Sequence, residues 1–260
     1  MISTALVAGF LAGFFGIGGG IITVPMLYYI FQTLNFDNNF IMHLAIGTSF
    51  SIIVPTAVMS VFTHYKHESV DFSVLKSYGL FVVTGVIAGT IISANLQTKS
   101  LVLFFSIALY FLAFNIFFIK EKNHIKKNFT LFSKIILGFI SGFVSSLMGI
   151  GGAIINVPVL KYAGFSITKA IGSAAAIGFL IALCGAIGFF ISGTYLKANL
   201  PLSIGFINIP AFLIIVPITT FMAKIGANAM HRSDKNKVNK LFGIFLLIVA
   251  TKFMYNYLNI

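Results

Sequence analysis

The sequence predicts an all-α polytopic membrane protein made of two related halves, and three observations lead to that fold class. Of the 260 residues, 58% are hydrophobic and only 8% are charged. The apolar residues form segments long enough to cross a bilayer, and the charged residues gather between them. One stretch of the sequence also occurs a second time. A chain with so few charges cannot cover the surface of a water-soluble fold.

Six apolar segments have the length of ordinary transmembrane helices, for which about 20 residues are needed. These segments are Phe40 to Thr63, Phe72 to Leu96, Ser100 to Ile119, Ala170 to Leu196, Leu200 to Met230 and Leu241 to Leu258. Two further segments, Ile2 to Leu34 and Ile135 to Leu160, are also apolar, but clusters of glycine interrupt them at residues 16–20 and 149–152. We therefore expect one glycine-broken segment and three transmembrane helices in each half.

The internal repeat is carried by the glycine-broken segments. Gly9 to Pro25 aligns without gaps on Gly142 to Pro158, with ten of seventeen positions identical. A shorter match pairs Ala45 to Thr48 with Ala170 to Ser173. Self-similarity at this level indicates duplicated architecture. We therefore divide the chain into a first membrane repeat (1–122), a basic cytoplasmic loop (123–133) and a second membrane repeat (134–260), which together form one integral membrane domain.

The positions of the basic residues predict that the two repeats are inverted. If each broken segment enters and leaves on the same side, 14 of the 17 Lys and Arg residues fall on one side and three on the other. A single crossing would divide them nine to eight. The first pattern is the cytoplasmic excess of membrane proteins. Three further crossings per half then turn the second half upside down and place both termini outside. A re-entrant segment and a tilted full hairpin both satisfy this count.

The glycine clusters are the candidate binding site. Backbone that leaves the helix inside a bilayer must be buried in protein or line a wet cavity. Where a second half-helix begins, its free N–H groups and positive dipole end favour an anion, and glycine lets a ligand approach the backbone. The competing interpretation is that the glycines only allow helices to pack closely. Pro25 and Pro158 are expected to be structural.

Polar side chains near the glycines complete the predicted site. Thr23 and its counterpart Asn156 follow the glycines by about one turn, and a second set lies on the shorter repeated motif. Ser and Thr in membrane helices also bond to their own backbone, which is the alternative for each of them. The predicted substrate-binding residues are Gly16, Gly18, Gly19, Gly20, Thr23, Thr48, Ser49, Gly149, Gly151, Gly152, Asn156 and Ser173.

Several other classes of function are disfavoured by the residues. The acids lie in or beside predicted loops, whereas proton relays and cation sites usually need an intramembrane carboxylate; they are Asp37, Glu68, Asp71, Glu121 and Asp234. The histidines are expected at interfaces, at helix ends or in loops: His43, His64, His67, His124 and His231. We find no nucleophile with a base and no phosphate loop, and therefore expect no enzyme, no catalytic residue, no metal and no cofactor. The net charge of +12 is explained by membrane orientation rather than by nucleic-acid binding.

With these motifs in view, the chain resembles the sulfite exporter TauE/SafE family of bacterial membrane permeases. The family's glycine-rich element reads Gly16-Ile17-Gly18-Gly19-Gly20 in the first half and Gly149-Ile150-Gly151-Gly152-Ala153 in the second. Its proline element and its A-x-G-[TS] stretch are matched as well, by Pro25 and Pro158 and by residues 45–48 and 170–173. The second half departs from the first at Ala153, which stands where the first half has Gly20.

The resemblance implies a permease of the bacterial inner membrane that carries small anions, typically sulfur-containing oxyanions such as sulfite or organosulfonates. We therefore expect a secondary transporter whose partners are a small anionic substrate and the lipid bilayer, with a homodimer left open. The alternative from another class is a non-transporting membrane subunit whose glycine motifs serve helix packing with a partner.

Overall fold

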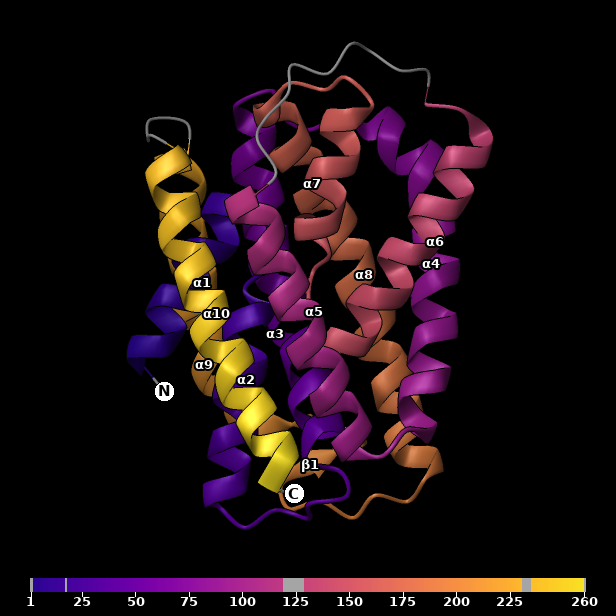
Figure 1. The fold of residues 1–260 in the computed structure, drawn as a ribbon, viewed down its shortest axis with the longest axis vertical. Helices are drawn as coiled ribbons and strands as arrows, with labels where there is room; N and C mark the ends of the chain where they lie inside the picture. The colour runs from indigo at the N-terminus through magenta and orange to yellow at the C-terminus, as the bar shows by residue number, and fades with distance from the viewer. Residues whose placement is uncertain (1, 17, 119–128, 231–234, 260) are drawn as a thin grey trace.

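The computed structural model describes residues 2–16, 18–118, 129–230 and 235–259, which form a bundle of helices along one long axis (Figure 1). The helices are α1 (Ile2–Phe15), α2 (Gly20–Thr33), α3 (Ile41–Lys66), α4 (Phe72–Asn95), α5 (Thr98–Phe118), α6 (Leu131–Met148), α7 (Ala153–Tyr162), α8 (Ile167–Tyr195), α9 (Ile209–Met230) and α10 (Lys235–Asn259). Two short strands, β1 (Ser203–Ile204) and β2 (Ile207–Asn208), form an antiparallel ribbon between α8 and α9.

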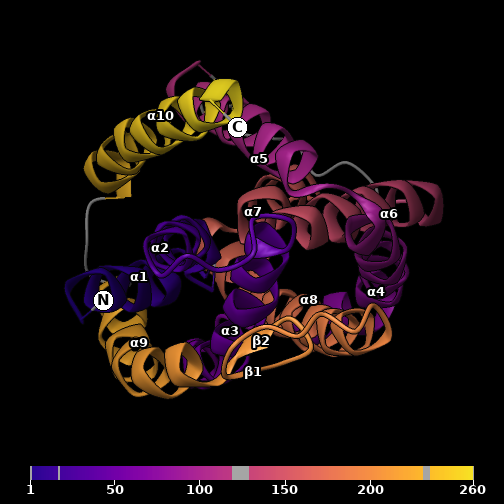
Figure 2. The same ribbon diagram turned by 90° about the horizontal axis from the view of Figure 1, so that it is seen from below.

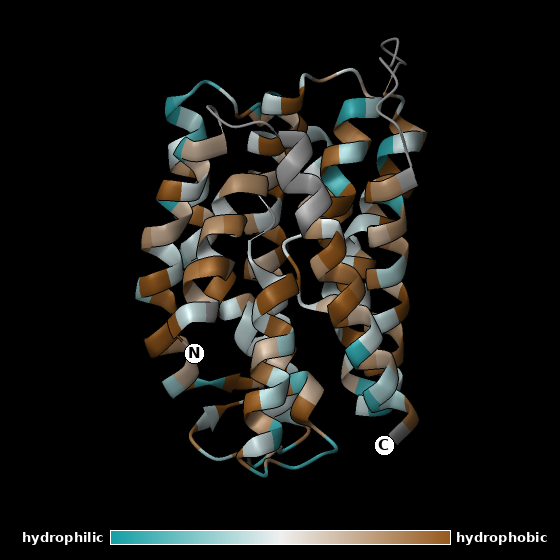
Figure 3. Cartoon of the chain, turned by 60° about the vertical axis from the view of Figure 1, so that its left-hand side comes forward, coloured by the Kyte–Doolittle hydropathy of each residue, from teal (hydrophilic) through white to brown (hydrophobic). Residues whose placement is uncertain are grey.

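The helices have the lengths and surfaces of a multi-pass membrane protein. Among the described residues, six helices are long and apolar enough to cross a bilayer, namely α3, α4, α5, α6, α8 and α9. Figure 3 shows hydrophobic residues along the flanks of the bundle, with the most hydrophilic colours concentrated towards its two ends. Lipid on the flanks and water at the ends account for this distribution.

Helix packing follows a pattern that repeats between the halves. α1 packs along α9, and α6, which carries the second copy of the α1 sequence, packs along α4. In the same way α2 packs on α3 and α7 on α8, while α3 contacts α9 and α8 contacts α4. α3 also packs on α8, and α5 on α10. Figure 2 shows α1 with α9 on one flank, α4 with α6 on the opposite flank, and α5 with α10 along a third. The two halves therefore interlock.

Small residues allow the flanking pairs to approach closely. A Cβ on Gly9 of α1 would lie 2.6 Å from the Cα of Thr219 in α9. Similarly, a Cβ on Gly142 of α6 would collide with the carbonyl oxygen of Val82 in α4. Packing of backbone against backbone is a common means of association for helices in membranes. Gly9 and Gly142 therefore serve close helix packing, and both lie outside the glycine clusters.

The two ends of the bundle are distinguished by their hydrogen bonds. At the end that holds β1 and β2, here called the ribbon end, Thr98 donates to the carbonyl of Asn39 (2.7 Å) and the amide of Asn208 donates to Thr48 (2.9 Å). At the other end, here called the far end, the amide of Asp71 donates to Ser173 (2.9 Å). α3 and α9 therefore begin at the ribbon end, whereas α4 and α8 begin at the far end (Figure 1).

The first turn of α4 at the far end is held by its N-cap. The carboxylate of Asp71 accepts a hydrogen bond from the amide of Ser73 (2.9 Å) and another from its hydroxyl (2.6 Å). The hydroxyl of Ser73, more than any other group, holds the pKa of the Asp71 carboxyl below its ordinary value. Ser166 and Thr130 occupy the same position before α8 and α6. Such residues satisfy N–H groups that the helix leaves free.

Helix boundaries differ most from the expectation in three places. The apolar run from Leu200 is not helical until Ile209, because the chain first forms the β1–β2 ribbon, in which Gly205 adopts φ +57°. α6 begins at Leu131, inside the range predicted as loop, and the part of that loop at 123–128 lies outside the described residues. α10 begins at Lys235, six residues before the predicted start.

Candidate functional site

Each glycine cluster forms the tip of a helical hairpin. α1 and α2 have 14 residues each, whereas in the second half α6 has 18 residues and α7 has 10. Gly16, Gly18 and Gly19 have φ of 67°, 70° and 79°, and Gly149 and Gly152 both have φ of 69°. Only glycine adopts this left-handed region without strain. The clusters therefore end one helix and reverse the chain within a few residues, as the sequence predicts.

The two tips meet inside the bundle. A Cβ on Gly18 would lie 3.6 Å from the Cα of Gly151, and one on Gly20 would collide with the carbonyl oxygen of Gly149. The long helices α3 and α8 border the same place, because Ile53 lies against Gly18 and Gly178 lies against the carbonyl of Gly151. The structure thus brings Gly18 and Gly20 of the first tip to Gly151 and Gly149 of the second. The other predicted glycines contact helices of the bundle: Gly16 lies against α8, Gly19 against α1, and Gly152 against α6, α7 and α8. Gly20 leaves no room for a side chain, whereas its counterpart Ala153 is accommodated and fully buried in the second tip.

The polar residues of the first tip form a closed chain of hydrogen bonds. Thr23 shares a hydrogen bond with Ser49 of α3 (2.9 Å) and also contacts the carbonyl of Gly19 (3.2 Å). Ser49 in turn donates to the carbonyl of Gly149 in the second tip (3.0 Å). All of these groups are buried. Thr23 and Ser49, both predicted site residues, therefore connect the two tips.

The second tip carries a different set of side chains. Asn156 of α7 is fully buried, and its Oδ1 accepts hydrogen bonds from Tyr78 of α4 (2.9 Å) and Ser141 of α6 (2.7 Å). Its Nδ2 is buried without a partner among the described residues, as is the Oγ of Ser145. Both atoms lie beside Gly152, the residue before the first turn of α7.

Thr48 and Ser173 lie in another environment. Their hydroxyls accept the hydrogen bonds from Asn208 and Asp71 that fix the chain just before α9 and α4. Beside them, Gly47 and Gly172 admit the backbone of the same two loops. In the structure these two site candidates contact helix-connecting loops, and none of their hydrogen bonds reaches a glycine tip.

Sequence reasoning missed Tyr78, Ser141 and Ser145. The repeat could have pointed to the two serines. Ser145 aligns with Ala12, and Ser141, one position before the aligned stretch, corresponds to Ala8. The second half is thus polar where the first half is apolar. Tyr78 lies on a helix outside the matched stretches, so only the fold could place it here.

Two histidines are more buried than expected. His43 and His64 occupy the end turns of α3, as predicted, but their exposed fractions are 1% and 0% rather than those of interfacial residues. A ring nitrogen of His43 contacts the carbonyl of Ser93 (3.0 Å), and one of His64 contacts the carbonyl of Gly13 (3.0 Å). His124 and His231 lie outside the described residues. Among the residues placed by the structure, no three His, Cys, Asp or Glu side chains cluster as metal ligands would.

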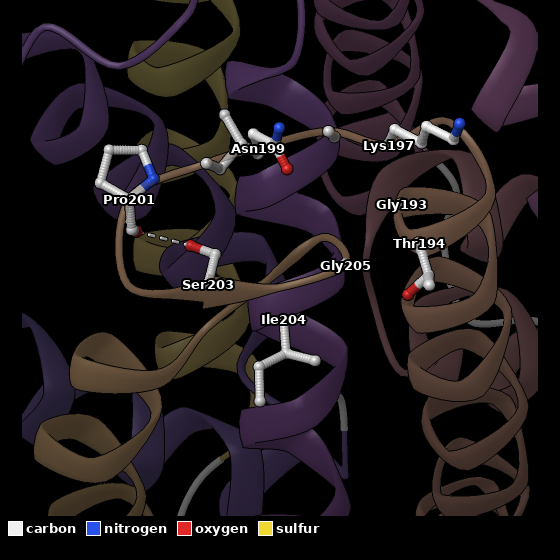
Figure 4. A pocket seen from close by; sticks show the side chains of 10 residues that line it. Gly193, Thr194, Lys197, Asn199, Pro201, Ser203, Ile204 and Gly205 are labelled. Carbon is white, nitrogen blue, oxygen red and sulfur yellow. Dashed lines mark hydrogen bonds between the residues drawn. The ribbon is translucent and has the colours of Figure 1, made fainter.

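An open pocket lies at the ribbon end, away from the tips. Lys197, Asn199 and Ser203 are among its lining residues, and the hydroxyl of Ser203 donates to the carbonyl of Pro201 (2.9 Å; Figure 4). None of the predicted site residues lines this pocket. Its position next to the loop between α8 and α9 makes it a surface feature of that end.

Comparison with known proteins agrees with the glycine motifs. A model of the family described as "Sulfite exporter TauE/SafE" matches residues 1–253. A "probable membrane transporter protein" of Haemophilus influenzae is 34% identical over 94% of this chain and 92% of its own length. One from Methanocaldococcus jannaschii is 27% identical over 95% of this chain and 94% of its own. No solved structure matches significantly. The chain belongs to the sulfite exporter TauE/SafE family of membrane transporters.

Proposed function

We propose that this chain is a secondary permease for a small anion and that its substrate is a sulfur-containing oxyanion such as sulfite or an organosulfonate. The observation that carries the proposal is the meeting of two glycine tips between α3 and α8. Broken helices whose tips meet at the interface of two repeats are a recurring substrate site of secondary transporters. The family description names sulfite, and the relatives are named as membrane transporters.

The chemistry of the tips favours an anion. α2 and α7 both begin at the tips, so their first N–H groups and positive dipole ends are directed there. The described acids Asp37, Glu68 and Asp71 lie in loops, away from the helix interiors that cation carriers use. A small oxyanion would accept hydrogen bonds from such a site without needing a buried counter-charge.

The arrangement of the helices supports an inverted repeat. α3 and α8 correspond in the two halves, and they begin at opposite ends of the bundle; the same holds for α4 and α9. Inverted repeats allow one half to rock against the other and expose a central site to each side in turn. We therefore assign alternating access to the two interlocked halves.

The basic residues orient this arrangement in a bacterial inner membrane. Lys66, Lys169 and Lys224 lie towards the far end, whereas Lys99 and Lys197 lie at the ribbon end. The excess of basic residues marks the far end as cytoplasmic. Both termini are then assigned to the outside.

Counterflow in proteoliposomes tests the function. Vesicles that contain the purified protein and are preloaded with unlabelled sulfite should accumulate external ³⁵S-sulfite transiently, and protein-free vesicles should not. Thiosulfate and sulfoacetate inside the vesicles should drive the same exchange if they are substrates. Absence of counterflow with all three anions, from protein that is folded in the vesicles, would refute the proposed function and favour the non-transporting subunit.

A further inference from the structure

The two hairpins are related by sequence, but the second buries more polar side chains than the first. Ser141, Ser145 and Asn156 of the second hairpin stand where the first has Ala8, Ala12 and Thr23. The hydroxyl of Thr23 is already occupied by Ser49 and Gly19. The hydroxyl groups of the first tip therefore already have hydrogen-bond partners. At the second tip, the donors Ser145 Oγ and Asn156 Nδ2 have no partner among the described residues; they are called the spare donors below.

The spare donors converge on one place. The Oγ of Ser145 lies 2.8 Å and the Nδ2 of Asn156 lies 3.1 Å from where a Cβ on Gly152 would stand. The Cδ1 methyl of Ile181 lies 2.5 Å from the same point, so this side chain must turn aside when an anion binds there. One acceptor can bridge two donors that lie no more than about 6 Å apart, and the distances of the two donors meet that condition. Both residues are fully buried, and neither atom has a partner among the described residues. A buried donor without an acceptor is costly, so this place requires one.

The Asn156 amide is held with its donor towards this place. Tyr78 and Ser141 both donate to Oδ1, which leaves Nδ2 as the free end of the amide. Tyr78 also contacts the carbonyl of Leu137 (3.2 Å), which fixes its own position. Tyr78 and Ser141 therefore act as positioning residues for Asn156.

The helix adds positive potential at the same point. The first hydrogen bonds of α7 run from the amides of Ile155 and Asn156 to the carbonyl of Gly152. The amides of Ala153 and Ile154 precede them and have no acceptor within the helix. The N-cap residue of α7 is Gly152, which has no side chain that could cap these amides.

Resting on the proposed function, we propose that the anion binds at the second tip alone, with Ser145 Oγ and Asn156 Nδ2 donating to its oxygens beside the α7 amides. The site would take one singly charged oxyanion group, such as hydrogen sulfite or a sulfonate. The basic residues of this hairpin, Lys134 and Lys161, lie in its outer turns; Lys134 is about 16 Å of helix from Ser145. Neutral donors and a helix dipole suit one charge better than two, because the cost of dehydrating an ion rises with the square of its charge.

The test measures counterflow of ³⁵S-sulfite by the full-length protein in proteoliposomes. Ser145→Ala removes one oxygen atom and should raise KM about tenfold, the effect of losing one hydrogen bond to a charged group. Asn156→Asp keeps an acceptor for Tyr78 and Ser141 but replaces the free donor, and it should abolish saturable exchange. Ser146→Ala is the matched control, since the neighbouring Ser146 hydroxyl is already bonded to the carbonyl of Phe143 (2.7 Å). That variant should keep the wild-type KM.

The outcomes separate this site from the function itself. If the wild-type protein exchanges sulfite but Ser145→Ala keeps its KM, the spare donors hold water rather than substrate and the site assignment is wrong. If the wild-type protein shows no exchange, the proposed function fails instead. Ser145→Ala decides the question alone should Asn156→Asp not fold, as judged by size-exclusion chromatography. Methanesulfonate should compete at least about tenfold better than sulfate, and equal competition would overturn the preference for a single charge.

Discussion

At the scale of single residues, the tips are held by hydroxyl groups whose partners lie far away in the sequence. Ser49 contacts Gly149 across 100 positions of the chain and Thr23 across 26. These bonds are buried, and a buried polar group that loses its partner is costly. The stability of the closed first tip should therefore depend on Ser49 more than on other buried serines of α3.

We predict that Ser49→Ala lowers the free energy of unfolding by about 1–3 kcal/mol, because it leaves the carbonyl of Gly149 without its donor and Thr23 without its partner. Ser60→Ala is the control on the same helix. Ser60 is 2% exposed, and its hydroxyl has no partner among the described residues, so its removal should be neutral or stabilising. Thermal unfolding of the purified variants measures both changes. Equal effects of the two substitutions would show that the Ser49 bonds contribute nothing.

At the scale of elements, the sequence predicted most helices because glycine and hydrophobic length act locally. Gly16 to Gly20 and Gly149 to Gly152 end helices wherever they stand, so both breaks could be placed in advance. The segment 200–208 was predicted as the start of a helix, although Pro201 and Gly205 are local signals for a turn. It forms the β1–β2 ribbon, which bonds to α3 from Asn208 to Thr48. This contact depends on the assembled fold and could not be predicted from the segment alone.

The candidate site residues also divide into those with a signal in the sequence and those that depend on the assembled fold. The glycines and Asn156 could be predicted as candidates from the repeat, because the repeat marks equivalent positions in the two halves. Tyr78 and the spare donor of Ser145 were not predicted, because their role arises only when α4, α6 and α7 come together. Thr48 and Ser173 were predicted from the shorter repeated motif. In the structure they accept hydrogen bonds from Asn208 and Asp71, in the loops before α9 and α4.

The flanking pair α4 and α6 gives a prediction at this scale. Replacing glycine by alanine inside a helix normally adds about 1 kcal/mol of stability. At Gly142 the new methyl would meet the carbonyl of Val82, so Gly142→Ala should instead cost about 1–3 kcal/mol. At Gly79 it would meet only the flexible end of Leu180 (3.0 Å), and Gly79→Ala should be neutral or stabilising. Thermal unfolding compares the two, and a stable Gly142→Ala protein would contradict backbone-to-backbone packing of α4 and α6.

At the scale of the whole molecule, the interlocked halves are compatible with the proposed exposure of a single site to two sides. Corresponding helices pack on opposite flanks. In two pairs, α3 with α8 and α5 with α10, a helix packs on its own counterpart from the other half. A two-fold axis relating the halves would pass through these two contacts. The tips meet along the first of these pairs. The central claim is that the halves lie upside down relative to each other about this shared centre.

Cysteine accessibility in intact cells tests that claim most directly. In a background in which Cys184, the only cysteine, is replaced by serine, one cysteine is introduced at exposed Asn38 before α3 and another, in a separate variant, at exposed Ser166 before α8. Both positions lie shortly before corresponding helices of the two halves. An impermeant maleimide should label the Asn38 variant from outside, and it should label the Ser166 variant only after the membrane is opened. Labelling of both variants from the same side would mean parallel repeats and would contradict the account.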